Sequence, residues 1–334
     1  MPTANAANRL MAHYLGTARA LPWRALPGSP AADPYRIWLS EVMLQQTTVA
    51  AVAPRFERFL ARWPTIHHLA AAPDEDILSE WAGLGYYARA RNLIACARLV
   101  AQDGAFPTSA AELRQLPGLG DYTAAAIAAI VFGEQVLPVD TNIRRVAARL
   151  FAIAEPTDQQ VREAMTPIVP AKRPGDFAQA LMDLGATICR PANPQCSRCP
   201  LAQDCAAFAS GTPELYPAPK AKRERPHRHG VAWWIRQGDQ VWLVRRPAKG
   251  LLGGMAALPG SDWGTDILPN ERVLARVRHV FTHFSLDLAV VPSSAAQGEG
   301  WWHPIDRLDE AGLPTLYAKA VQAVLSAPLL DAAA

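Results

Sequence analysis

The sequence contains no long apolar run and carries little net charge. Its 334 residues have a formal charge of +3, and 19% of them are charged. No stretch is apolar for the length that a membrane span requires, and the N-terminal residues lack the charged start and apolar centre of a signal peptide. We therefore expect a folded cytoplasmic protein without a membrane partner. The slight positive charge suits a polyanionic partner but does not establish one.

Cysteine is also scarce, because the chain has five and four of them fall within one short segment. The isolated Cys96 lies in a helical pattern, where we expect it to pack in the core. The other four are separated by six, two and five residues, and in a reducing compartment such a cluster favours a metal centre over disulfides. Thiolates bind tetrahedral zinc as well as iron–sulfur clusters, so the spacing leaves the metal open. The cluster comprises Cys189, Cys196, Cys199 and Cys205.

The chain divides into a helical part and a mixed part. From about residue 34 to residue 208, apolar residues recur at helical spacing, with breaks at proline and glycine. Residues 213–229 are rich in proline and basic groups, which is typical of an exposed linker. We expect an all-α domain over residues 1–212 and an α+β domain over residues 230–334.

The sequence beyond the linker predicts strands and one closing helix. Residues 231–236 and 240–246 predict a hairpin around Gln237, Gly238 and Asp239. Residues 276–291 predict a long strand or a pair of strands, and residues 316–325 predict a helix.

Glu41 stands in a context that suits acid catalysis. On a helix, its neighbours would be Ile37, Trp38, Leu44 and Gln45, which form a mostly apolar face. Removal of water raises the pKa of a carboxyl group, as a general acid near neutral pH requires. The alternative is an ordinary surface glutamate, which a single residue cannot exclude.

Asp140 directly precedes a helical stripe that contains Ile143, Val146 and Leu150. Its simplest interpretation is a helix N-cap. Donors at a helix start also keep a carboxylate ionised, so that it can face a developing cation. Glycosidic bonds break through an oxocarbenium-like state, often with one protonated and one ionised carboxyl group. Glu41 and Asp140 fit these two roles.

The segment LPGLG, residues 116–120, lies between two helical patterns. Gly118 and Gly120 would let backbone N–H groups point outward at a helix N-terminus, a geometry that binds a DNA phosphate without reading sequence. A plain turn between helices explains the segment equally well.

Six motifs in order resemble those of the helix-hairpin-helix DNA glycosylases, most closely the adenine glycosylases of the MutY family. They are LPWR at 21–24, WLSEVMLQQT at 38–47, GLGYYARARN at 83–92, the LPGLG hairpin, VDTNIRRV at 139–146 and the cysteine spacing. The resemblance implies a multidomain protein, with an all-α helix-hairpin-helix glycosylase domain that includes an iron–sulfur loop at 189–205. An α+β Nudix-like domain that recognises 8-oxoguanine would follow.

The activity that the resemblance implies is base excision repair. The enzyme would hydrolyse the N-glycosidic bond of adenine mispaired with 8-oxoguanine or guanine in double-stranded DNA. We expect a bacterial monomer that associates with the nucleoid through DNA.

Matched position by position, the resemblance implies a role for each site residue. Glu41 would protonate the adenine leaving group, Asp140 would stabilise the sugar cation, and Asn142 would support Asp140. The four cysteines would hold one [4Fe-4S] cluster. The pocket for the flipped adenine would be lined by Trp23, Arg24 and Gln179.

Six further residues would probe the stack or read the lesion. Thr282 stands where the family more often has serine, so it keeps the hydroxyl and adds a methyl group. The six are Gln45, Gln46, Tyr86, Phe281, Thr282 and His283.

Glycosylases of the endonuclease III type also cut the strand, with a hairpin lysine as nucleophile. Here Tyr122 occupies that position, and the only lysine ahead of the linker is Lys172, in a loop that reads as exposed. We therefore predict a monofunctional enzyme that uses water after the base departs.

Three rivals have specific discriminators. A pyrimidine-specific glycosylase with lyase activity is disfavoured by Tyr122, and a non-catalytic iron–sulfur DNA-binding or redox-sensing protein is disfavoured by the retained carboxyl pair. A zinc-bearing nucleotide hydrolase would need a glutamate-rich helix for magnesium, and in the next helical stretch after LPGSDW this chain offers only Glu271.

Overall fold

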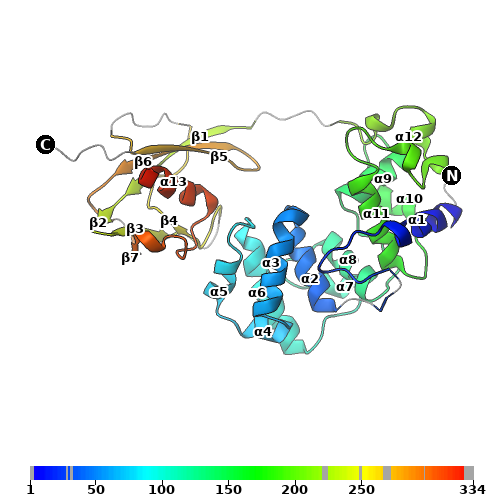
Figure 1. The fold of residues 1–334 in the computed structure, drawn as a ribbon, viewed down its shortest axis with the longest axis horizontal. Helices are drawn as coiled ribbons and strands as arrows, with labels where there is room; N and C mark the ends of the chain where they lie inside the picture. Colours follow the sequence, from blue (N-terminus) through cyan, green and yellow to red (C-terminus); the bar gives the residue numbers. More distant parts are fainter. Residues whose placement is uncertain are drawn as a thin grey trace. The chain divides into compact units, whose positions relative to one another are not determined.

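The chain separates into two compact units (Figure 1). The computed structural model describes residues 4–27, 29–30, 33–219, 225–247, 250–265, 272–296 and 298–326. The first unit comprises Met1–Ala72 with Arg91–Ala221, and the second comprises Pro73–Ala90 with Lys222–Ala334. One border of this division falls within the predicted linker of residues 213–229, whereas residues 73–90, which the prediction assigns to the first domain, group with the second unit. The outer borders at residues 212 and 230 stay a prediction.

The part of the chain before the linker is almost entirely helical, as its periodicity predicts. The helices described there are α1 (Ala4–Thr17), α2 (Pro34–Leu44), α3 (Val49–Arg62), α4 (Ile66–Ala71), α5 (Asp74–Glu80), α6 (Tyr87–Asp103), α7 (Ala110–Leu113), α8 (Asp121–Val131), α9 (Thr141–Leu150), α10 (Asp158–Met165), α11 (Pro174–Thr187) and α12 (Ala206–Ala209).

Local signals in the sequence start several of these helices. Asp33 caps α2 by accepting from the Tyr35 and Arg36 amides, and Pro34 stands at the first helical position, where it needs no N–H donor. Thr157 and Gln160 form a capping box at the start of α10. The cap of α2 fixes where the helix that carries Glu41 begins.

The core of the first unit joins α1, α9, α10 and α11. It includes Leu10, Ile143, Val161 and Phe177, all of which are buried. Alanine-rich α8 packs against both α2 and α11, because its small side chains allow close approach. Cys96 is fully buried within α6, so its predicted place in the core is confirmed.

The second unit contains two sheets and a closing helix, α13 (Thr315–Ser326). One sheet has the order β1-β6-β5, and β2, β3, β4 and β7 form the other. The strands are β1 (His227–Trp234), β2 (Arg236–Gln237), β3 (Gln240–Arg245), β4 (Ala256–Ala257), β5 (Ala275–Val280), β6 (Ser285–Pro292) and β7 (Gly300–Pro304).

The predicted strand pairs are confirmed in part. β2 and β3 form the hairpin around Gly238 and Asp239, β5 and β6 form an antiparallel pair, and the closing helix is present. Most of the first predicted strand instead joins β1, which pairs in parallel with β6. Local patterns do not reveal this pairing, because a parallel partner must lie far along the chain.

Two absences hold for the described part of the chain. No described helix is long and apolar enough to cross a membrane. No helix occurs in the described residues 258–265 and 272–274, where a Nudix hydrolase would carry its glutamates. Glu271 itself lies outside the described residues.

Candidate active site

A cavity of about 630 Å³ lies in the first unit among α2, α8, α9 and α11. Its volume falls within the range of about 300–1,000 Å³ that is typical of ligand pockets. It brings together residues that lie far apart in the sequence and that the motifs single out. Those that line it are Trp23, Arg24, Glu41, Gln45, Gln46, Tyr122, Asp140, Asn142 and Gln179.

Glu41 projects from α2 into this cavity, and only 6% of its surface is exposed. Its buried Oε2 atom has no hydrogen-bond partner among the described residues. The pKa of Glu41 is raised to about 7, and burial is the largest cause; the Tyr122 hydroxyl and the Arg24 charge oppose the rise, while the Asp140 charge adds to it. The carboxyl group can therefore carry a proton near neutral pH. Among the described residues, none forms a hydrogen bond with its Oε2 atom.

Asp140 caps α9, as its position before the helix predicts. One carboxylate oxygen accepts from the Ile143 amide at 2.6 Å, and the other accepts from the Asn142 side-chain amide at 2.9 Å. Burial nevertheless raises the pKa of Asp140, although these donors and the Arg145 charge oppose the rise. The donors therefore limit the rise that burial causes, but they do not bring the pKa below its ordinary value.

A chain of hydrogen bonds continues from Asp140 toward the cysteine loop. The Asn142 side-chain oxygen accepts from Arg145 Nη2 at 2.8 Å, and the same guanidinium donates to the carbonyls of Gly185 at 2.7 Å and Cys189 at 2.8 Å. Arg145 belongs to the VDTNIRRV motif, but no role was predicted for it. The sequence does contain a signal for this contact, because residues three apart on a helix, such as Asn142 and Arg145, lie on the same face.

The wall that would face a base is held by a buried ion pair. Arg24 Nη1 contacts Asp183 Oδ2 at 2.7 Å, and both side chains are less than one-tenth exposed. Trp23 packs edge-on against Phe56, with ring centroids 5.4 Å apart. Gln179 Oε1 accepts a long bond of 3.4 Å from the Tyr14 hydroxyl. Sequence reasoning missed Asp183, although an acid within the apolar stretch of α11 was a signal.

Tyr122 lies at the start of α8 and lines the cavity at the position where a lyase would carry lysine. Burial raises the pKa of its phenol well above the ordinary value, and Glu41 adds to the rise. No lysine belongs to the described residues around this cavity. Lys172 is exposed, as predicted. The described cavity therefore offers no amine nucleophile.

The predicted hairpin connects α7 and α8. Gly118 has φ +78°, a conformation that favours glycine, and an added Cβ would lie 2.8 Å from Asn92 Cβ. Gly120 caps α8, so free amides at this helix start can face an anion. Gln45 Nε2 donates to Thr123 Oγ1 at 3.1 Å and to the Gly118 carbonyl at 3.4 Å, which ties a predicted probing residue to the hairpin.

The four cysteines line one small cavity beside the fully buried Arg149. Arg149 Nη1 donates to Cys189 Sγ at 3.3 Å, and the Cys205 thiol lies 3.4 Å from the Arg149 carbonyl, to which it donates. The cavity thus presents four thiols, a donor set that suits zinc as well as an iron–sulfur cluster.

The predicted lesion-reading residues of the second unit gather at one turn. The Phe281 amide donates to the Phe284 carbonyl at 2.8 Å and closes the β5–β6 turn. Phe281 stacks on Trp263, while Thr282 and His283 are exposed at the tip. Tyr86, which belongs to the same unit, hydrogen-bonds through its hydroxyl to that of Thr282.

Two predicted probing residues have unusual backbone conformations. Gln46 has φ +56° and Tyr86 has φ +49°, although neither is glycine. Such conformations are uncommon for side-chain-bearing residues and concentrate at functional sites. Both side chains are exposed.

Comparison with known proteins agrees with this arrangement. Residues 39–171 match the HhH-GPD superfamily base excision DNA repair protein family, and residues 230–323 match the NUDIX domain family. The adenine DNA glycosylase of Homo sapiens is 37% identical over 76% of this chain, which spans 57% of that relative's length. The adenine DNA glycosylase of Mycolicibacterium smegmatis is 38% identical over 61% of this chain and 71% of its own.

A solved structure supports the same fold. The thermostable thymine-DNA glycosylase superposes with a TM-score of 0.55 and 28% identity, over 61% of this chain and 95% of its own. The chain therefore belongs to the adenine DNA glycosylase family, also called the MutY family, and combines its helix-hairpin-helix domain with a Nudix-like domain.

Proposed function

We propose that this protein hydrolyses the N-glycosidic bond of adenine mispaired with 8-oxoguanine or guanine in double-stranded DNA. The observation that carries the proposal is the buried Glu41 carboxyl, which has a pKa of about 7 and an unpartnered oxygen. It faces a cavity that also contains Asp140. An acid and a second carboxylate in one pocket are what glycosidic cleavage needs.

In this reaction Glu41 donates its proton to a ring nitrogen of adenine. The C1′–N9 bond breaks, its electron pair stays with the base, and neutral adenine departs. The Asp140 carboxylate stabilises the positive charge left on the sugar. A water molecule then adds to C1′ and gives a proton to the Glu41 carboxylate, which restores the acid and leaves an abasic site in an unbroken strand.

The pocket receives an adenine that has left the helical stack. Extrusion costs a few kcal/mol and is easiest for a mispaired base, which contributes to selectivity. Trp23 offers an aromatic edge, and Arg24 and Gln179 offer polar groups along the base. Because Asp183 holds Arg24, the guanidinium is positioned before DNA arrives.

The four cysteines hold one [4Fe-4S] cluster in the proposed protein. The all-thiol lining of one small cavity and the match to the HhH-GPD family support this cofactor. Once bound, the cluster would supply iron–thiolate bonds that fix the loop of residues 189–205. The Arg149 N–H group next to Cys189 would offset the negative charge of the sulfur.

Recognition of 8-oxoguanine belongs to the Nudix-like domain in this proposal. Thr282 and His283 stand exposed at the β5–β6 tip, where a nucleic acid can reach them. We infer that the enzyme acts as a monomer, with domains at residues 1–212 and 230–334 and the linker between them.

The substitution Glu41→Gln tests the proposal directly. The amide keeps the shape of the side chain but cannot deliver a proton, so single-turnover adenine excision should fall by roughly 10²–10⁴-fold while mispaired DNA still binds. Glu57→Gln, at an exposed position on α3, is the matched control and should behave like the wild type.

Near wild-type excision by Glu41→Gln would remove Glu41 from the chemistry. Borohydride added during the reaction should trap no covalent DNA adduct. A trapped adduct would favour the lyase of the endonuclease III type instead.

A further inference from the structure

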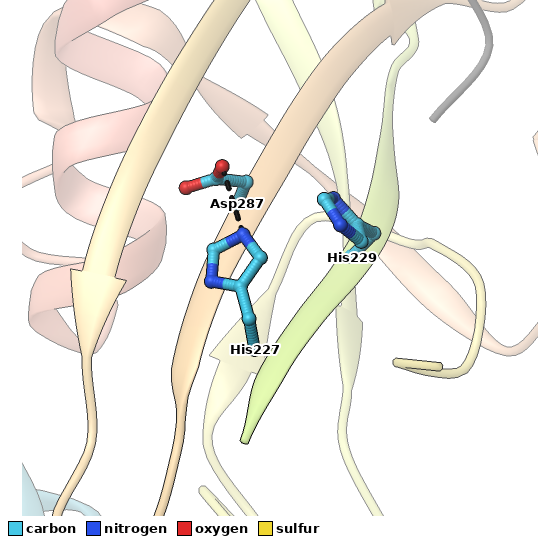
Figure 2. A group of neighbouring side chains, drawn as sticks. All are labelled: His227, His229 and Asp287. Carbon is cyan, nitrogen blue, oxygen red and sulfur yellow. Dashed lines mark hydrogen bonds and ion pairs between the residues drawn. The ribbon is translucent and has the colours of Figure 1, made fainter. Parts of the chain in front are cut away.

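Three potential metal-binding side chains meet on one face of the β1-β6-β5 sheet in the second unit (Figure 2). His227 and His229 lie two residues apart on β1, so their side chains share a face. Asp287 is the register partner of His229 on the parallel strand β6. This face is opposite the one that packs Ala232, Leu286 and Leu288 into the core. One potential ligand atom from each of the three residues lies within 4.8 Å of the others.

The pair formed by His227 and Asp287 already has a spacing close to that of two ligands on one ion. His227 Nε2 lies 3.0 Å from Asp287 Oδ2. A tetrahedral zinc ion with bonds of about 2.0 Å separates such ligand atoms by about 3.3 Å. The other nitrogen of the ring, Nδ1, lies 2.7 Å from Ser285 Oγ. This second contact would fix the ring orientation, as outer partners of metal-bound histidines do, and a bound ion would replace the hydrogen bond between Nε2 and Asp287.

His229 supplies the third donor and has an unmet bonding need. Its Nδ1 atom is buried and has no hydrogen-bond partner among the residues that the structure describes. Its backbone is fixed, because its amide donates to the Gly264 carbonyl at 2.7 Å and its carbonyl accepts from the Gly264 amide at 3.0 Å. A buried nitrogen without a partner is unfavourable, and a metal ion would satisfy it.

We propose that His227, His229 and Asp287 bind one zinc ion. Two imidazoles and one carboxylate form a known zinc donor set, with a fourth position left for water or an anion. The two oxygens of Asp287 face different residues. Oδ2 faces His227, whereas Oδ1 lies 3.8 Å from Nε of Arg278, whose side chain is 70% exposed. The ion would tie the first residues of β1 to β6, where the first strand of the second unit begins. This site is independent of the glycosylase reaction.

Zinc stoichiometry of the full, iron-loaded protein tests this site. The protein is dialysed against a weak chelator and then against micromolar Zn²⁺, and zinc per chain is measured by elemental mass spectrometry. The wild type should bind one zinc ion per chain. In His229→Ala, and in the nearly isosteric Asp287→Asn, the zinc content per chain should be at least tenfold lower. His67→Ala, which removes an exposed imidazole from α4, should retain it.

X-ray absorption at the zinc edge then identifies the donors. Nitrogen and oxygen ligands at about 2.0 Å support the site, whereas sulfur at about 2.3 Å would assign the zinc to the cysteines and overturn the proposal. The proposal would also be overturned if His229→Ala and Asp287→Asn bound as much zinc as the wild type, or if the wild type bound none. Circular dichroism of the variants shows that any loss of zinc does not reflect unfolding.

Discussion

Removal of water, more than a bonding partner, keeps a proton on Glu41. Burial is the largest cause of its raised pKa, and the nearby Asp140 charge adds a smaller contribution. Asp140 experiences the same burial but receives two direct donors from α9, at Ile143 and Asn142. The two carboxyl groups therefore differ in bonding within one cavity, and this difference assigns the acid to Glu41.

The pH dependence of excision follows from this assignment. Glu41 acts only while protonated, so the single-turnover rate should fall by about tenfold per pH unit as pH rises above about 7. Glu57→Gln should show the same profile, and binding of mispaired DNA, measured at each pH, should not follow it. A rate that stays level to about pH 9 would mean that Glu41 is not the proton donor.

Residue-level prediction succeeds where the determining neighbours are local. The apolar neighbours of Glu41 along α2 indicate burial, and the position of Asp140 before a helix indicates a cap. The partner of Arg24 could not be predicted in this way, because Asp183 lies 159 residues along the chain. The direction in which the pKa of Asp140 shifts could not be predicted either, because burial raises it while hydrogen bonds to the carboxylate lower it.

At the scale of helices, the close approach of α9 and α11 positions the side chain that donates to the Asp140 carboxylate. A Cβ added to Gly185 of α11 would lie 2.6 Å from Asn142 Cβ and 3.1 Å from Asn142 Cα. The Gly185 carbonyl also accepts from Arg145. Any larger side chain at Gly185 must therefore move Asn142, which donates to Asp140.

Gly185→Ala should lower the excision rate at least tenfold and destabilise the protein by about 1–3 kcal/mol, the usual effect of overpacking. Gly16→Ala is the matched control, because Gly16 is also helical but an added Cβ would meet nothing within 4 Å. It should leave excision unchanged and maintain or raise stability. Single-turnover kinetics and thermal unfolding of both variants decide between these outcomes.

Elements differ in how far their sequences determine them. Capped amphipathic helices such as α9 and α10 are predictable, since both the cap and the apolar stripe are local. The β2–β3 turn is predictable from Gly238, which has φ +58°. The partner of β1 is not, because alternation along a strand does not say which distant strand lies beside it.

In the whole molecule, each of the two units has a group of site residues for a separate task. The first unit contains the cavity with both carboxyl groups, and the second contains the exposed β5–β6 tip. Chemistry and discrimination between opposing bases should therefore respond to different substitutions.

His283→Ala should reduce the preference for adenine opposite 8-oxoguanine over adenine opposite guanine several-fold, because it removes an exposed polar group from the tip. His303→Ala, on β7, should preserve the ratio of the two single-turnover rates. An unchanged ratio in His283→Ala would assign lesion recognition to another surface.

The sealed setting of Glu41 has a consequence for successive rounds of catalysis. Under the proposed reaction, the hydrogen that leaves this carboxyl group with adenine is replaced by one from the water that adds to C1′. Each round of hydrolysis therefore regenerates the acid inside the cavity, without a proton from bulk solvent. The enzyme is ready for the next lesion as soon as the abasic product leaves.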